Sequence, residues 1–88
     1  MEIDLHLNDT HPGFDPRMAL LEQMEIFEKA FDTALAQNQF ELRVIHGVGS
    51  GKLKSEIHKF LKGNKYIRSY SCEWHPMYGV GSTLIIFD

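Results

Sequence analysis

The feature that most constrains the fold is a hydrophobic strand that leads through a glycine-rich loop into an amphipathic helix. Residues 41–45, ELRVI, form a short apolar run, and residues 46–51, HGVGSG, hold glycines at alternate positions. Apolar side chains then recur at three- and four-residue steps up to Leu61, and Gly63 follows at the position of a helix C-cap. A strand joined to a helix in this way favours a parallel crossover in a sheet.

The rest of the chain repeats this alternation of strand and helix. We expect strands at 2–7, 66–71 and 82–88, a helix from Pro16 to about Asn38 with Asp15 as its N-cap, and loops at 8–15 and 73–81. The apolar stripe of the first helix is predicted to comprise Met18, Leu21, Met24, Phe27, Phe31 and Leu35. The order β-α-β-α-β-β, with an antiparallel last pair, predicts an α/β fold (an α+β two-layer sandwich): a mixed four-stranded sheet with two helices.

Length and composition predict a single domain, residues 1–88. The sequence has no apolar run long enough for a membrane span and no signal-peptide pattern, so we expect no membrane partner and a cytoplasmic location. The single cysteine, Cys72, excludes an internal disulfide. The net charge is −3, but residues 43–68 carry seven bases and one acid. This segment is either a basic face for a polyanion or a solvated helix surface.

Two of the predicted strands end at the same edge of the sheet. Asp4 and His6 close the first strand, and His46 closes the second. Glycines 47, 49 and 51 then precede the helix, where bare amides and the positive helix end favour an anion. The loop is therefore predicted to bind a phosphate, and the alternative is a tight turn without a ligand.

Three segments together resemble a known family. IDLH at 3–6, VIHGVGSGKLK at 44–54 and GVGSTLII at 79–86 are similar to the three blocks of the Smr (small MutS-related) domain. The resemblance covers nearly the whole chain and implies a fold like that of the C-terminal domain of the third bacterial translation initiation factor. Many Smr domains are endonucleases on DNA or RNA, some need a divalent metal, and some end larger proteins. The chain is therefore expected to be a nucleic-acid-binding endonuclease, or a non-catalytic nucleic-acid or phosphate-binding module attached to an N-terminal domain.

The resemblance, together with the position of the loop at the start of the second helix, suggests roles for individual residues. Asp4, His6 and His46 are the candidate catalytic residues, with Asp4 orienting His6 or holding Mg²⁺ or Mn²⁺. The candidate phosphate-binding residues are Gly47, Gly49, Gly51, Lys52, Lys54, Gly79 and Gly81. The alternatives are an ordinary surface histidine at position 6 and a loop-ordering role for the ring of His46.

Two aromatic residues near the end of the chain are further candidates. Trp74 and Tyr78 are predicted to stack on bases or to pack as an apolar cluster under their loop. The other histidines, His11, His58 and His75, receive no role from the sequence.

Overall fold

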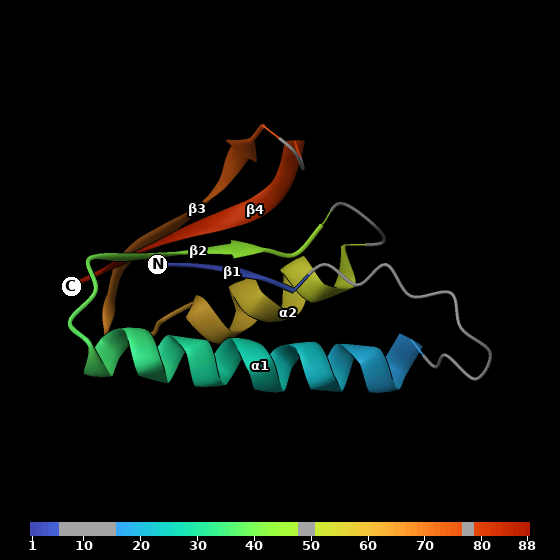
Figure 1. Cartoon of the computed structure of the whole chain (residues 1–88), viewed down its shortest axis with the longest axis horizontal. Helices are drawn as coiled ribbons and strands as arrows, with labels where there is room; N and C mark the ends of the chain where they lie inside the picture. The colour runs from blue at the N-terminus through green and yellow to red at the C-terminus, as the bar shows by residue number, and fades with distance from the viewer. Residues whose placement is uncertain (6–15, 48–50, 77–78) are drawn as a thin grey trace.

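A single mixed sheet is covered on one face by two helices. The structure is a computed structural model and describes residues 1–5, 16–47, 51–76 and 79–88. The elements are β1 (Glu2–Asp4), α1 (Pro16–Ala36), β2 (Glu41–Ile45), α2 (Lys52–Leu61), β3 (Ile67–His75) and β4 (Gly79–Phe87). Figure 1 shows both helices on the same side of the sheet, and the N- and C-termini at the same end of the molecule.

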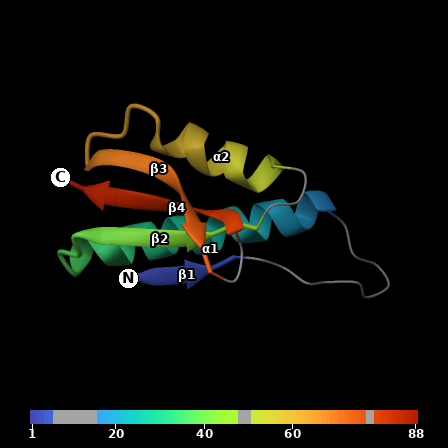
Figure 2. The same ribbon diagram turned by 90° about the horizontal axis from the view of Figure 1, so that it is seen from above.

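The strand order confirms the predicted topology. The sheet has the order β1-β2-β4-β3, which is seen from above in Figure 2. β1 and β2 are parallel, whereas β4 is antiparallel to both β2 and β3. Because β1 and β2 run the same way, their carboxyl ends lie at one edge of the sheet, as the sequence predicted.

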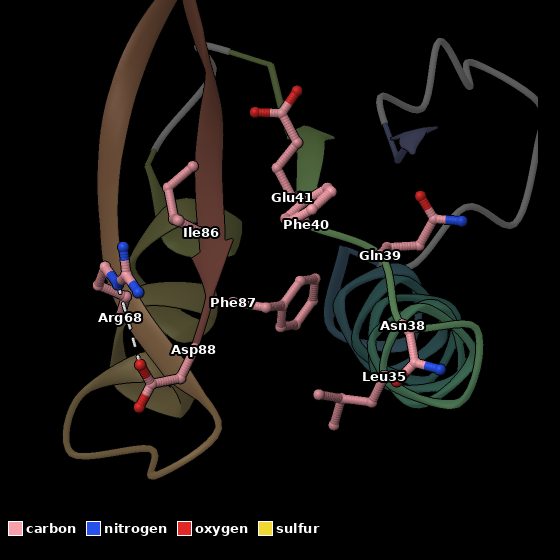
Figure 3. Close-up of a pocket in the computed structure, with 9 residues that line it drawn as sticks. All are labelled: Leu35, Asn38, Gln39, Phe40, Glu41, Arg68, Ile86, Phe87 and Asp88. Atoms are coloured by element: carbon pink, nitrogen blue, oxygen red, sulfur yellow. Dashed lines mark ion pairs between the residues drawn. The ribbon is translucent and has the colours of Figure 1, made fainter.

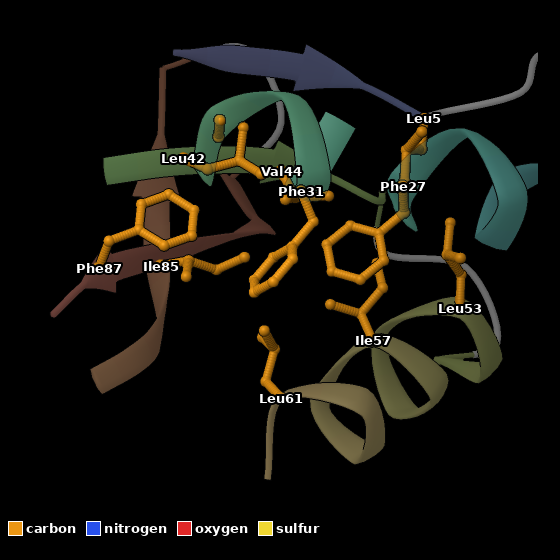
Figure 4. Close-up of a cluster of buried hydrophobic side chains, with 11 residues drawn as sticks. Leu5, Phe27, Phe31, Leu42, Val44, Leu53, Ile57, Leu61, Ile85 and Phe87 are labelled. Carbon is orange, nitrogen blue, oxygen red and sulfur yellow. The ribbon is translucent and has the colours of Figure 1, made fainter. Parts of the chain in front are cut away.

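The core lies between the sheet and the helices. It contains aromatic and aliphatic side chains from α1, β2, α2 and β4 and from Leu5 just after β1, shown in Figure 4: Leu5, Phe27, Phe31, Ala34, Leu42, Val44, Leu53, Ile57, Leu61, Ile85 and Phe87. The ring of Phe60 packs edge-on against Phe27 and Phe31, with centroids 5.3 and 5.2 Å apart. These contacts join the two helices to each other.

The predicted apolar stripe of α1 is wrong at its beginning. Met18 and Leu21 are 58% and 61% exposed, whereas Phe27 and Phe31 are buried. Successive three-residue steps drift by about 60° around a helix, so Met18 lies half a turn away from Phe27. Ala19, Leu20 and Ala34 occupy the helix face that packs on the core.

The final hairpin is longer than the sequence predicted. Residues 73–75 belong to β3 and residues 79–81 belong to β4, so the predicted loop 73–81 is wrong over most of its length. Glu73 pairs with Ser82, and His75 pairs with Gly79. Cross-strand pairing therefore extends both strands past Gly79 and Gly81, a residue type with weak strand preference.

The helix ends follow their local sequence. α1 begins at Pro16 as predicted but ends at Ala36, two residues earlier than expected. Asn38 adopts a left-handed conformation with φ 54°, and the amide of Gln39 donates to the carbonyl of Ala34. α2 ends at Leu61, and Gly63 follows with φ 75°, as its predicted capping role requires.

Candidate functional site

The edge at which β1 and β2 end is joined to the start of α2 by the glycine loop. The amide of Leu5 donates to the carbonyl of Ile45 at 2.7 Å, so the chain after Asp4 stays beside β2. Gly47 and Gly51 have φ values of 78° and 81°, a conformation that side chains with a Cβ rarely adopt. Gly51 directly precedes α2, whose N-terminus has no side-chain cap. Gly49 lies outside the described residues.

At this edge, β4 is hydrogen-bonded to the two residues that follow β2. The backbone amides of His46 and Gly47 both donate to the carbonyl of Gly81, each at 2.9 Å. The structure therefore brings His46, Gly47 and Gly81 together, although Gly81 lies far away in the sequence. Gly79, with φ 59°, pairs with His75 at the turn end of the hairpin.

The ring of His46 is hydrogen-bonded through both nitrogens. It is 7% exposed. Its Nδ1 lies 2.9 Å from the carbonyl oxygen of Gly47, and its Nε2 lies 2.8 Å from Oγ1 of Thr83. This geometry fits the predicted alternative in which the ring orders the loop, and a catalytic role for His46 stays a prediction.

His58 joins the same network from α2. Its Nε2 lies 2.9 Å from Oγ1 of Thr83, and the rings of His46 and His58 are 6.5 Å apart, edge to face. Burial lowers the pKa of both histidines. Lys54 lowers both pKa values further by charge repulsion, and the Gly47 carbonyl partly opposes the effect at His46. Both shifts favour the neutral form of the two rings.

Asp4 lies on the other face of the sheet. It pairs directly with Ile45, and residues paired across neighbouring strands share a face. The next residue in each strand points the opposite way: Leu5 enters the core between sheet and helices, and His46 contacts Thr83 and His58 on that same side. The structure thus places Asp4 and His46 at one edge but on opposite faces. His6, and the predicted contact between it and His46, lie outside the described residues.

The predicted basic segment divides into separate groups. Lys52 and Lys54 lie in the first turn of α2, beside the glycine loop, as expected. Three other bases of the segment lie near acids: Arg43 with Glu2, Lys59 with Glu56 and Arg68 with Asp88, at 3.8, 4.0 and 3.8 Å. Among the described bases of residues 43–68, Lys52 and Lys54 are the two that directly follow the glycine loop in the chain.

The described residues do not form a metal centre. Among them, no three His, Cys, Asp or Glu side chains converge as metal ligands. Asp4 pairs with the apolar Ile45, so this position of β2 supplies no second oxygen ligand. A divalent metal at Asp4 stays a prediction, and no chemical step is derived through it.

Of the two aromatic candidates near the end of the chain, the structure describes Trp74. Trp74 is 68% exposed on β3, so the predicted packing under a loop is wrong for this side chain. Its ring is accessible for stacking. Tyr78 lies outside the described residues.

Sequence reasoning missed Thr83, which contacts the His46 ring directly, and His58, which reaches the same hydroxyl. Thr83 and His58 come from β4 and α2, 37 and 12 positions away along the chain. The alternation of STLIIF does place Thr83 on the same strand face as Ile85 and Phe87, and that signal was available. The pairing of Thr83 with Val44 and Cys72 could not be predicted from the sequence.

A pocket of about 350 Å³ lies at the opposite end of β2. Figure 3 shows its lining residues: Leu35, Asn38, Gln39, Phe40, Glu41, Arg68, Ile86, Phe87 and Asp88. None of the predicted site residues lines this pocket. The candidate site at the glycine loop is therefore separate from this pocket.

Comparison with known proteins identifies the family. The profile of the Smr domain matches residues 17–88. The chain belongs to the Smr domain family. This confirms the resemblance drawn from the three sequence blocks, although the matched segment begins after Asp4 and His6.

Similar proteins carry this region as a small part of a longer chain. Endonuclease MutS2 of Streptococcus gordonii is 32% identical over 66 residues, and that of Streptococcus sanguinis is 33% identical over 66 residues. Each match covers 75% of this chain and 8% of the relative.

A solved structure confirms the fold. The crystal structure of the Smr domain of Thermus thermophilus MutS2 superposes with a TM-score of 0.74 and 26% identity. The match covers 99% of this chain and 96% of that one. The α/β frame predicted from the sequence is therefore the fold of Smr domains. No helix among the described residues has the length and apolar character needed to cross a membrane.

Proposed function

We propose that this Smr domain binds nucleic acid by holding a backbone phosphate at the glycine loop. The observation that carries the proposal is the coincidence of three features at one edge of the sheet. These are left-handed glycines at 47 and 51, the uncapped N-terminus of α2, and the two lysines of its first turn. Backbone amides and a positive helix end favour a phosphate, and lysines add charge without base specificity.

Cleavage of the bound strand is a second candidate function. The support is the name of the relatives, endonuclease MutS2, and the sequence pattern that pairs Asp4 with His6. In this proposal His6 transfers a proton at the phosphodiester and Asp4 orients its ring, with Mg²⁺ or Mn²⁺ as the candidate cofactor. The nucleic acid, DNA or RNA, is the proposed partner. Because the relatives are much longer chains, a covalently linked N-terminal domain is a further proposed partner.

The non-catalytic alternative also has a specific observation in its favour. Both ring nitrogens of His46 are occupied within the protein, and Asp4 lies on the opposite face of the sheet. Two of the three candidate catalytic residues are therefore not placed to act together. Such a domain would hold the phosphate and leave it uncut.

A binding and nicking experiment separates these functions. The protein and its Asp4→Asn variant are mixed with supercoiled plasmid and with structured RNA, in Mg²⁺, Mn²⁺ or EDTA, and binding is followed by fluorescence anisotropy. If the domain is a nuclease, the parent cuts and Asp4→Asn cuts on the order of 10²-fold more slowly, at similar affinity. Binding without cutting by both proteins supports the non-catalytic module. Absence of binding to either polymer refutes the proposed function.

A further inference from the structure

A continuous chain of hydrogen bonds connects α2 to the glycine loop through β4. It runs from His58 Nε2 to Thr83 Oγ1 at 2.9 Å, from Thr83 Oγ1 to His46 Nε2 at 2.8 Å, and from His46 Nδ1 to the Gly47 carbonyl at 2.9 Å. Thr83 is fully buried. Its hydroxyl thus contacts two imidazoles inside the protein.

The chemistry of these groups gives the chain one direction. A carbonyl oxygen only accepts, so Nδ1 of His46 carries a proton. In a neutral ring Nε2 then carries no proton, so it accepts a hydrogen bond from the Thr83 hydroxyl. Having donated its one hydrogen, Thr83 accepts at its oxygen from Nε2–H of His58.

The direction holds only while the His46 ring is neutral, because His58 donates through Nε2–H in its neutral and in its protonated form. If His46 gained a second proton, its Nε2–H would point at the hydroxyl hydrogen of Thr83 and force it to turn away. The groups that face the two rings in the described residues are Lys54 on α2, Tyr70 and Cys72 on β3, and Thr83 on β4. Lys54 repels a second positive charge, which lowers the pKa of both rings. The Cys72 sulfur is a distant contact, 4.0 Å from His58 Nε2.

We propose that His58 and Thr83 are positioning residues that hold the His46 ring in its Nδ1–H tautomer and, through that proton, hold the first glycine of the loop. The bond from Nδ1 fixes the carbonyl of Gly47, the residue that turns the chain with φ 78°. The loop amides beyond it are those that we propose bind phosphate, so the functional importance of this positioning rests on the proposed function. The tautomer assignment itself does not.

The test combines NMR of the imidazole nitrogens with a phosphate titration. Long-range ¹H–¹⁵N spectra distinguish protonated from bare ring nitrogens, so the parent at pH 7.5 is expected to show His46 protonated at Nδ1 and His58 at Nε2. Thr83→Val removes the hydroxyl but keeps the shape. It should shift the His46 Nε2 signal toward that of a nitrogen without a hydrogen bond. It should also shift the Gly47 amide and weaken inorganic phosphate binding about five-fold, the effect of one hydrogen bond.

Thr83→Ser is the matched control, because it keeps the hydroxyl. It should restore the His46 signals and the phosphate affinity, which a purely steric role of the threonine methyl would not predict. A parent protein with His46 protonated at Nε2 overturns the proposal, and so does a Thr83→Val variant with unchanged His46 signals and affinity. The parent measurement needs no variant, so the proposal stays testable even if Thr83→Val does not fold. If the parent binds no phosphate, the proposed function fails, while the tautomers still decide this inference.

Discussion

At the scale of single residues, the candidate site depends on how buried polar atoms are paired. His46 donates to a backbone carbonyl, and its other nitrogen reaches a fully buried hydroxyl. In the described part of the chain, every buried side-chain nitrogen and oxygen has a hydrogen-bond partner. The histidine of the glycine motif is therefore a structural member of the core as well as a neighbour of the loop.

The neutral state of these rings predicts a dependence of stability on pH. Burial lowers the pKa of His46 and of His58 in the folded protein below the ordinary value of 6.5. The unfolded chain therefore binds more protons just below pH 6.5, and the free energy of unfolding falls as the pH falls through that range. The contribution is fully present above pH 6.5. Urea midpoints measured at pH 7.5, 6.5 and 5.5 should decrease in that order.

His58→Gln provides the comparison. It removes one of the titrating groups while its amide can still donate to Thr83, and His46 remains. Its midpoint should fall less than that of the parent between pH 7.5 and 5.5. Equal decreases in the two proteins would contradict neutral burial of His58.

At the scale of elements, α2 has two chemically different ends. Its N-terminus adjoins the glycine loop and carries Lys52 and Lys54, whereas Lys62 and Lys65 follow its C-terminus. A ten-residue helix separates these ends by about 15 Å. Positive charge therefore lies both at the site and away from it, so substitutions of the two lysine pairs can be compared at equal change of net charge.

Replacing both site lysines should weaken nucleic-acid binding. Lys52→Glu with Lys54→Glu is expected to lower the affinity and to reduce the slope of log affinity against log salt by about 1.4 to 1.8, for two lost phosphate contacts. Anisotropy titrations at several salt concentrations measure both quantities. Lys62→Glu with Lys65→Glu changes the net charge equally and should leave most of the slope intact. Equal losses in the two double variants would mean that binding follows net charge alone.

At the scale of the whole molecule, both helices cover one face of the sheet and neither covers the other (Figure 1). The helix-covered face holds the aromatic core and the chain of His58, Thr83 and His46, whereas Asp4 lies on the opposite face. The two faces meet at the edge where β1 and β2 end. A substrate that contacts both Asp4 and the glycine loop must therefore lie across that edge.

The aromatic core should dominate the stability of the domain. The ring of Phe31 is buried, and ring centroids of Phe27, Phe60 and Phe87 lie 6.1, 5.2 and 5.4 Å from it. Phe31→Ala is expected to cost about 3–5 kcal/mol of the free energy of unfolding, because it removes apolar contact and leaves a cavity. Phe40→Ala is the control, since that side chain is 89% exposed and its loss should cost about 0.5 kcal/mol or less. Urea unfolding measures both, and similar losses would show that the core is misassigned.

The sequence by itself determined the order of the elements, the parallel pairing of the first two strands and the family. These follow from local periodicity, glycine and proline positions and three short motifs, all of which act over a few residues. β2 was predicted within its observed bounds, and the prediction of α2 was correct at Leu61 and Gly63.

Only the tertiary structure decided which face each residue occupies and how far the hairpin extends. Alternation along a strand defines two faces, but the helices decide which one is covered, and so Asp4 and His46 are separated. Met18 and Leu21 are exposed because the position of α2 and the sheet, not the helical period alone, selects the buried stripe. Thr83 meets His46 and His58 because strand register joins positions far apart in the chain, and register is a property of the assembled sheet.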